Sequence, residues 1–257
     1  MAVLVDQYPK AMLDCGLFKE YSVDAFNNTR FINDSCAINV DAVVPELVPM
    51  LKKYRLDDLL GLSRTHQHFR LKPNEVAETS IITASACSIP VPIDDPQRLV
   101  MHLKTINLTE FEGGYKPVPY MWAFDKESGK FFALQYFNGS NRQMIARLAA
   151  LGERTKQLSE FLIEFIHALK QHHMEEDLGI FLRYQDLISW DEAKEMLMED
   201  TSVQKRTQIM YPMLAASGVL QEKQVHPVDR VITTQWIVGE TIDGVMQCRS
   251  VMNCHNH

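Results

Sequence analysis

Long apolar runs are absent from this sequence, and their absence argues against a membrane protein. No stretch approaches the roughly 20 consecutive apolar residues that a transmembrane helix needs. The first residues, MAVLVDQYPKAMLDCGLF, carry Asp6, Lys10 and Asp14 where a secretory signal needs an unbroken apolar segment. We therefore expect a cytoplasmic protein that has no membrane partner.

Cysteine is scarce, and basic residues are outnumbered by acidic ones. Five cysteines are spread thinly along 257 residues, an odd number that fits reduced thiols better than a disulfide framework. The 26 Lys and Arg residues face 33 Asp and Glu residues, for a formal net charge of -7. Proteins that bind nucleic acid need clustered cations to displace the counterions of the phosphates. We therefore expect no nucleic-acid partner and take a small molecule as the substrate.

Motifs for two common kinds of active site are also missing. The chain contains no G-x-S-x-G motif for a nucleophilic serine, and Gly113-Gly114 is not followed by the Lys or the helix that a phosphate-binding loop requires. It also has no internal repeat and no long Pro/Gly/Ser-rich linker. With 46% hydrophobic residues the chain can bury a sizeable core. We predict that residues 1–257 form a single globular domain.

Apolar periodicity predicts strands near both ends of the chain and helices between them. An i, i+3, i+4, i+7 stripe predicts a long amphipathic helix at residues 155–175. Alternating runs rich in β-branched or aromatic residues predict strands, and the loops at 125–129 and 239–244 indicate two hairpins. The predicted helices are 43–62 in two pieces, 142–151, 155–175, a short one from 189, and 204–216, and the predicted strands are 65–71, 76–89, 118–124, 130–137, 230–238 and 245–252.

This order of elements predicts an α+β fold. The sheet is expected to be mostly antiparallel and to consist of the N-terminal strands and the two hairpins, packed with a central helical segment. Trp122 alternates with its neighbours in a hairpin strand, so we expect its side chain to be buried.

The segment THQHFRL places His66 and His68 two residues apart. In a strand, side chains at i and i+2 lie on one face with backbones about 6–7 Å apart, and two imidazoles can converge from there on one ion. Nine histidines make such a pair a weak signal by itself, and a solvated or hydrogen-bonded face is the alternative. We predict that this pair is the centre of a metal site.

Other residues could complete such a site. The last ten residues, CRSVMNCHNH, combine thiol and imidazole groups, which Zn²⁺ prefers. Cys254, His255 and His257 become metal ligands if the C-terminal hairpin shares a sheet with the first strands, and the alternative is a frayed terminus. Glu75 follows the Pro73-Asn74 turn and is predicted to be a third ligand or the catalytic acid–base partner of a metal-bound water. A solvent-facing Glu75 is the alternative.

A longer stretch around the histidines carries a resemblance. The segment LGLSRTHQHFRLKPNE, residues 60–75, resembles a stretch of uncharacterised, largely fungal hypothetical proteins, in which H-x-H-F is followed some residues later by an acid. The resemblance covers about sixteen residues. It implies that His66, His68, Phe69 and Glu75 belong to one unit, and it implies no activity.

Together these features predict a cytoplasmic metalloprotein that acts as an enzyme on a small molecule. The expected cofactor is a divalent ion, zinc first, with iron or copper competitive if the ligands are only histidines and a carboxylate. The alternative is a metal-free module that binds a small apolar ligand or a protein through the aromatic hairpin, unless its aromatics are core. Those aromatics are Tyr120, Trp122, Phe124, Phe131, Phe132 and Tyr136. Reaction type, substrate and oligomeric state stay open.

Overall fold

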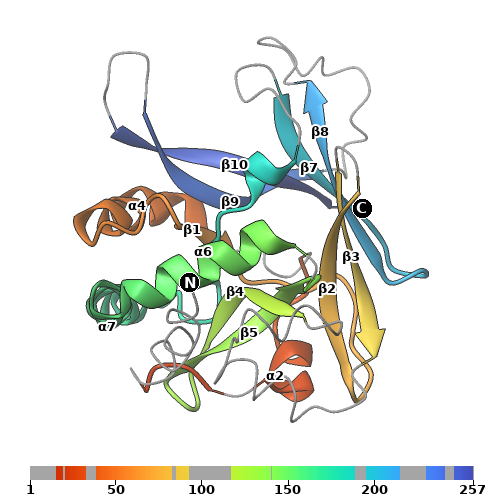
Figure 1. Cartoon of the computed structure of the whole chain (residues 1–257), viewed down its shortest axis with the longest axis horizontal. Coiled ribbons are helices and arrows are strands. Elements are labelled where there is room, and N and C mark those ends of the chain that lie inside the picture. The colour runs from red at the N-terminus through yellow and green to blue at the C-terminus, as the bar shows by residue number, and fades with distance from the viewer. Residues whose placement is uncertain are drawn as a thin grey trace, which may run out of the picture.

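The protein is built around a closed β-barrel (Figure 1). The structure, a computed structural model, describes residues 16–19, 21–32, 39–82, 85–92, 117–139, 141–188, 195–214, 230–240 and 246–256. Within these residues, ten strands follow one another around the barrel in the order β1-β6-β4-β5-β2-β3-β8-β7-β10-β9. The ring closes because β1 pairs with β6 on one side and with β9 on the other.

The elements have the following bounds. The strands are β1 (Leu60–Arg64), β2 (Glu75–Ile82), β3 (Ser85–Pro92), β4 (Val118–Asp125), β5 (Lys130–Phe137), β6 (Leu178–Leu182), β7 (Glu195–Ser202), β8 (Thr207–Leu214), β9 (Arg230–Glu240) and β10 (Met246–Asn256). The helices are α2 (Val23–Asn27), α4 (Val44–Lys53), α6 (Arg142–Glu153) and α7 (Thr155–His172), with short 3-10 turns η1 (Val40–Ala42) and η3 (Gln185–Leu187).

The predicted α+β fold is wrong, because the strands close into a mixed barrel instead of forming a sheet packed with a helical segment. Most neighbouring strands are antiparallel, but β2 pairs in parallel with β5 and β7 in parallel with β10. These pairs join residues that are far apart in the sequence. The periodicity within one strand does not indicate which distant strand it pairs with.

Several local predictions are confirmed. The two hairpins form as β4–β5 and β9–β10, and the helices predicted at 142–151 and 155–175 form as α6 and α7. In the β4–β5 turn, Asp125 accepts hydrogen bonds from the backbone N–H groups of Glu127 and Ser128, and Gly129 takes a positive φ of 69°. Trp122 is buried as predicted, with 1% of its surface exposed.

Other local predictions are wrong. Residues 204–216 were expected to be helical, but the described part of this range, 204–214, forms the turn of the β7–β8 hairpin and strand β8. Residues 56–62 were expected to continue a helix, but β1 begins at Leu60. The single strand expected at 76–89 is two strands, β2 and β3, that pair with each other. Short apolar runs fit both a buried strand and a buried helix, so tertiary pairing decides between them. The short helix expected from 189 begins outside the described residues.

The helices cover one side of the barrel from outside. Helix α4 contacts β1, β9 and β10, while α6 contacts β4 and β6, and both helices touch α7. The apolar stripe of α7 faces inward, and Phe165 stacks on Phe131 of β5 with ring centroids 6.4 Å apart. Figure 1 shows these helices on the side away from β2 and β3. Across the described residues, no helix has both the length and the apolar character that a membrane span requires.

The barrel interior contains hydrogen-bonded polar side chains as well as apolar ones. Tyr120 of β4 donates to Oε1 of Gln135 of β5, and Gln135 donates to Oε1 of Gln208 of β8 over 3.4 Å. Thr79 of β2 and Ser88 of β3 share a hydrogen bond of 2.6 Å. The Gln135–Gln208 bond joins β5 and β8, which are not neighbours in the barrel, so these two side chains meet inside it. Buried polar groups need such partners, because an unpaired one costs free energy.

Candidate metal centre

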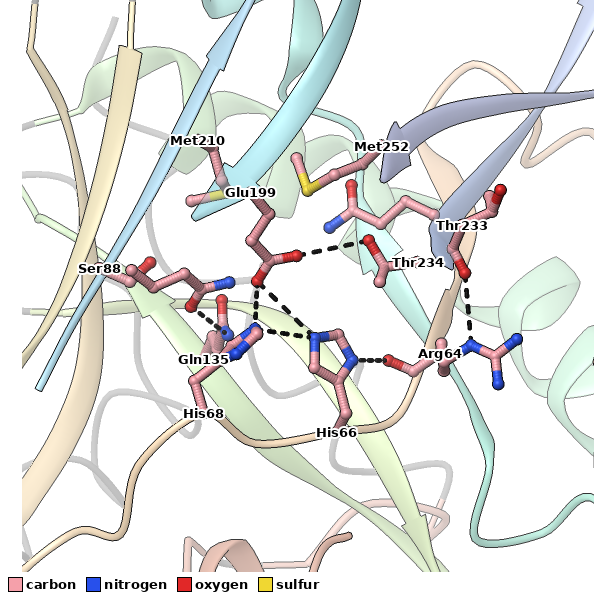
Figure 2. A network of polar contacts seen from close by, with 12 residues as sticks. Arg64, His66, His68, Ser88, Gln135, Glu199, Met210, Thr233, Thr234 and Met252 are labelled. Atoms are coloured by element: carbon pink, nitrogen blue, oxygen red, sulfur yellow. Dashed lines mark hydrogen bonds and ion pairs between the residues drawn. The ribbon is translucent and has the colours of Figure 1, made fainter. Parts of the chain in front are cut away.

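Three buried side chains bring ligand atoms together at one end of this polar interior. The Nε2 atoms of His66 and His68 lie 3.1 Å apart, and Oε1 of Glu199 lies 2.5 Å from His68 Nε2 and 3.7 Å from His66 Nε2. Figure 2 shows both imidazoles reaching from one chain segment toward the Glu199 carboxylate. The exposed fractions of the three residues are 8%, 6% and 1%, so the group is shielded from bulk solvent. Among the described residues, this group could hold a metal ion.

The two histidines lie in an irregular segment between β1 and β2, so the strand predicted at 65–71 is wrong. The segment's only β-type pairing among the described residues is a bridge between Gln67 and Phe31. The expected consequence of the spacing nevertheless holds, because the backbone is extended enough for His66 and His68 to face the same way. Their rings meet edge to face with centroids 4.8 Å apart.

Side chains from α2 hold this irregular segment in place. Asn27 donates from Nδ2 to the carbonyl oxygen of Leu71 and accepts at Oδ1 from the Leu71 N–H, both at 2.9 Å. Gln67, which lies between the histidines, donates from Nε2 to the carbonyl oxygens of Asn27 and Thr29 at 3.1 and 2.5 Å. Asn27 thus takes the place of a neighbouring strand for the backbone groups of Leu71, while the Gln67 side chain holds the segment against the backbone of Asn27 and Thr29.

A backbone carbonyl orients the His66 ring. Nδ1 of His66 lies 2.8 Å from the carbonyl oxygen of Arg64, and because that oxygen can only accept, Nδ1 carries the proton and donates. The lone pair of Nε2 is therefore directed toward His68 and Glu199. A second hydrogen bond of this kind behind a ligating nitrogen is the usual arrangement in metal-binding histidines, since it sets both the tautomer and the ring orientation.

Glu199 is the buried charge of the group. Burial by itself raises the pKa of the Glu199 carboxyl, but the adjacent imidazoles of His68 and His66 outweigh burial and hold that pKa well below its usual range. Thr234 of β9 adds a longer hydrogen bond from Oγ1 to Oε2 at 3.4 Å. The carboxylate is therefore ionised at neutral pH, in a place where only a nearby positive charge or donor makes ionisation tolerable.

The separations between the ligand atoms fit a small divalent ion. Zinc binds nitrogen and oxygen at about 2.0–2.2 Å, which places two ligands about 3.0–3.5 Å apart at octahedral or tetrahedral angles. The distances of 3.1 and 3.7 Å from His66 are close to this range, whereas the 2.5 Å between His68 and Glu199 is a hydrogen-bond distance. An ion would take the place of the proton that His68 and Glu199 share, and these two groups would move apart by about 0.5–1 Å.

Glu75, the predicted acid–base residue, has a different partner. Both of its carboxylate oxygens bind the guanidinium of Arg206, and Oε2 also accepts from the Lys72 N–H at 2.7 Å. The hydrogen bonds from Arg206 lower the pKa of Glu75 despite the opposing effect of burial. Among the described residues, Glu75 is not one of the side chains that converge with the histidines. Its catalytic role stays a prediction.

The C-terminal residues form a strand, so a frayed terminus is the wrong alternative. Strand β10 runs to Asn256, and Cys254 lies in register with Glu199 of the parallel neighbour β7. The Cys254 side chain is fully buried with Ile32 and Ile232, and it is not among the three converging groups. Its role as a ligand stays a prediction. The side chain of His255 and all of His257 lie outside the described residues, so the predictions for them are not tested.

Glu199 is the residue that sequence reasoning missed. It lies 131 positions after His68, and the segment that carries it, residues 195–202, was not predicted to be a strand. A usable signal was present in EMLMEDTS, where strand alternation places Glu199 on the same face as Leu197. Both residues are buried, and a carboxylate on an apolar face indicates a partner inside the fold.

The aromatic hairpin is mainly part of the core, and two of its rings, Phe124 and Phe132, also line a pocket. Each of its six aromatic side chains has between 0% and 4% of its surface exposed. They pack on one another and on neighbouring rings, as in the edge contact between Trp122 and Phe18 at 6.1 Å. The alternative function has no exposed aromatic patch at this hairpin, but two of the rings line a pocket, and the alternative stays a prediction.

Comparison with protein-family models, curated proteins and solved structures finds no match to this chain. The resemblance of residues 60–75 is therefore not tested by these comparisons. The functional argument depends on the geometry of the His66, His68 and Glu199 group alone.

Proposed function

We propose that this chain is a metal-dependent enzyme in which His66, His68 and Glu199 bind one divalent ion and a small molecule reacts there. The observation that carries the proposal is the convergence of three buried ligand atoms, with separations of 2.5 to 3.7 Å, from two segments that are distant in the sequence. A hydrogen-bonded His68–Glu199 pair alone does not need a second imidazole nitrogen 3.1 Å away, whereas a metal centre requires all three ligand atoms to converge.

The number of ligands supports a catalytic centre. Structural zinc sites are closed by four protein ligands, while catalytic sites keep three and leave a position for water or substrate. In the described part of the chain, the converging group has three members. An ion with an open position acts as a Lewis acid and lowers the pKa of bound water to about 7.

Zinc is our first choice of ion, because two imidazoles and one carboxylate form a ligand set that zinc enzymes use. The same two-histidine, one-carboxylate set also suits ferrous iron, and imidazole suits copper. Iron or copper would direct the chemistry toward oxygen instead of hydrolysis. Metal analysis of the protein as isolated distinguishes these ions.

The surroundings of the group support a small substrate. Only 8% of the His66 surface and 1% of the Glu199 surface are exposed, so a macromolecule cannot lie across the ligands. The interior nearby offers neutral amides and hydroxyls, including Gln135 and Thr234 (Figure 2), and the buried Gln208 bonds to Gln135. Burial raises the pKa of the Tyr120 phenol in the same interior, which keeps it a hydrogen-bond donor at neutral pH.

An exogenous-ligand titration tests whether the centre is catalytic. The metal-free protein is loaded with Co²⁺, which has a visible spectrum, and azide is then added. We expect the cobalt bands to shift with saturation at one azide per ion, because azide occupies the open position. A spectrum that azide leaves unchanged would show a closed, structural site and overturn the proposal. Activity of the chelated and reloaded protein against a panel of small esters, amides and phosphates then identifies the reaction.

A further inference from the structure

Two segments of the chain meet at the metal group and meet again at a second place. The segment between β1 and β2 carries His66 and His68 and ends at Glu75, the first residue of β2. The β7–β8 hairpin carries Glu199 and, in the turn before β8, Arg206. Arg206 binds Glu75. The histidine-bearing segment and the Glu199-bearing hairpin are therefore in contact at two places, the metal group and the Arg206–Glu75 pair.

Arg206 uses most of its donors on the histidine-bearing segment. Its NH1 donates to Oε1 of Glu75 at 3.1 Å, and its NH2 binds Oε2 of the same carboxylate. Its Nε and NH2 also donate to the carbonyl oxygen of Arg70, at 3.1 and 2.6 Å, and the guanidinium lies 5.9 Å from the centroid of the Phe69 ring. A planar guanidinium suits this combination, because it can engage a carboxylate and a carbonyl with fixed geometry.

The contact of Arg206 with the histidine-bearing segment lies directly beside the residues that carry the metal ligands. Phe69 and Arg70 follow His68 directly and lie outside the strands. Among the described residues, the β-type pairing of this segment is confined to Gln67, whose backbone bonds to Arg30 and Ile32. Arg206 has a left-handed backbone with φ of 53°, which a non-glycine residue adopts only when its surroundings require it. With both side chains only 25% and 13% exposed, the pair is also partly shielded from solvent.

We propose that Arg206 and Glu75 are positioning residues for the metal centre: their ion pair keeps His66 and His68 at coordination distance from Glu199. The inference rests on the proposed metal site. Without the pair, the histidine-bearing segment is restrained mainly from the α2 side, and metal binding must order it against β7 at a cost in entropy. Contacts behind the ligands of a metal typically change its affinity by about 10–100-fold. Glu75 therefore acts on the site through Arg206 and not as a proton-transfer group.

The test compares zinc affinity among matched variants, measured by competition with a chromophoric chelator. We expect Arg206→Gln and Glu75→Gln each to weaken zinc binding about tenfold. The double variant should be no weaker than the singles, because both remove one interaction. The zinc affinity of Arg206→Lys should lie between those of the wild type and Arg206→Gln. Lysine keeps the positive charge but lacks the planar guanidinium that binds both carboxylate oxygens.

The matched control is Arg154→Gln. Arg154 also binds a carboxylate with two nitrogens, at 2.5 and 2.7 Å from Asp58, and donates to the carbonyl of Arg55 at 2.6 Å. Its side chain is 32% exposed, close to the 25% of Arg206. It connects other segments, so Arg154→Gln should change zinc affinity less than twofold.

The Co²⁺ spectrum separates positioning from general stability. At saturating cobalt, we expect shifted bands in Arg206→Gln but the wild-type spectrum in Arg154→Gln, because only the former changes the ligand geometry. If Arg206→Gln fails to fold, Glu75→Gln and Arg206→Lys still decide the matter. Wild-type zinc affinity and an unchanged cobalt spectrum in the folded variants would overturn the positioning role alone. Absence of zinc binding in the wild type would overturn the proposed metal centre, and the positioning role with it.

Discussion

Zinc should raise the thermal stability of this protein, and Glu199→Gln should remove that effect. Glutamine has the size of glutamate and keeps one oxygen, which can accept the hydrogen bond from His68, while its amide nitrogen takes the place of the oxygen that faces Thr234. The substitution therefore leaves the shape of the buried group nearly intact. It removes the negative charge, which is the property that a divalent ion requires of this ligand.

The size of the effect follows from mass action. Zinc that binds only the folded state at 100 times its dissociation constant adds about 2.7 kcal/mol to the free energy of unfolding. For a chain of 257 residues, each kcal/mol moves the melting temperature by about 2–4 °C. The metal-free wild type should thus gain about 5–10 °C when zinc is added at that excess. Glu199→Gln should gain less than about 2 °C under the same conditions.

Differential scanning calorimetry of chelated and zinc-loaded protein measures both shifts. Glu160→Gln is the matched control, because Glu160 is half exposed and pairs with Lys156 of the same helix α7, so this variant should keep the full shift. An equal zinc-induced shift in the wild type and in Glu199→Gln would show that the stabilising ion binds elsewhere and would refute the reasoning.

Three further outcomes follow from the structure. Trp122→Ala, at a position 1% exposed, should lower the free energy of unfolding by about 3–5 kcal/mol in urea titrations; a loss below about 1 kcal/mol would contradict its place in the core. Gly179→Ala should yield little folded protein by circular dichroism, because the new Cβ would lie 2.2 Å from the carbonyl oxygen of Trp122, and a wild-type melting temperature would contradict that close approach. Since Arg206 lowers the pKa of Glu75 below its ordinary 4.5, the carboxylate stabilises the fold above that pH and loses this effect as the pH falls through the folded-state pKa. The stability gap between wild type and Glu75→Gln should therefore be larger at pH 6 than at pH 3, and a gap that widens in acid would contradict the sign.

Local signals predicted elements that pack mainly with their own neighbours. The β4–β5 and β9–β10 hairpins and helices α6 and α7 carry their periodicity in one continuous stretch, so the sequence was sufficient to identify them. Closure of the barrel depends instead on β1 meeting β9 and on the parallel pair β7 and β10. Those partners are separated by long stretches of chain, and no single window of sequence contains both.

In the candidate site, too, the residues that are close in sequence could be predicted and the distant one could not. His66 and His68 could be proposed because they are adjacent in the sequence, and an extended backbone brings their Nε2 atoms together even without a strand. Glu199 reaches them only through the folded barrel, and it lies in a segment whose strand character was not recognised. Glu75 was singled out because it is near in sequence, but its contacts are with Arg206, a residue that only the fold brings close.

Elemental analysis tests the central claim most directly. The untagged protein, purified after expression in medium that contains zinc, iron and copper, should hold about one equivalent of one divalent metal. The His66→Ala, His68→Ala double variant should remain folded and hold none. His172→Ala should keep the full equivalent, because His172 lies on the surface at the end of α7 and pairs with Glu46 at 3.2 Å. A wild type without metal, or a double variant that retains it, would contradict the account.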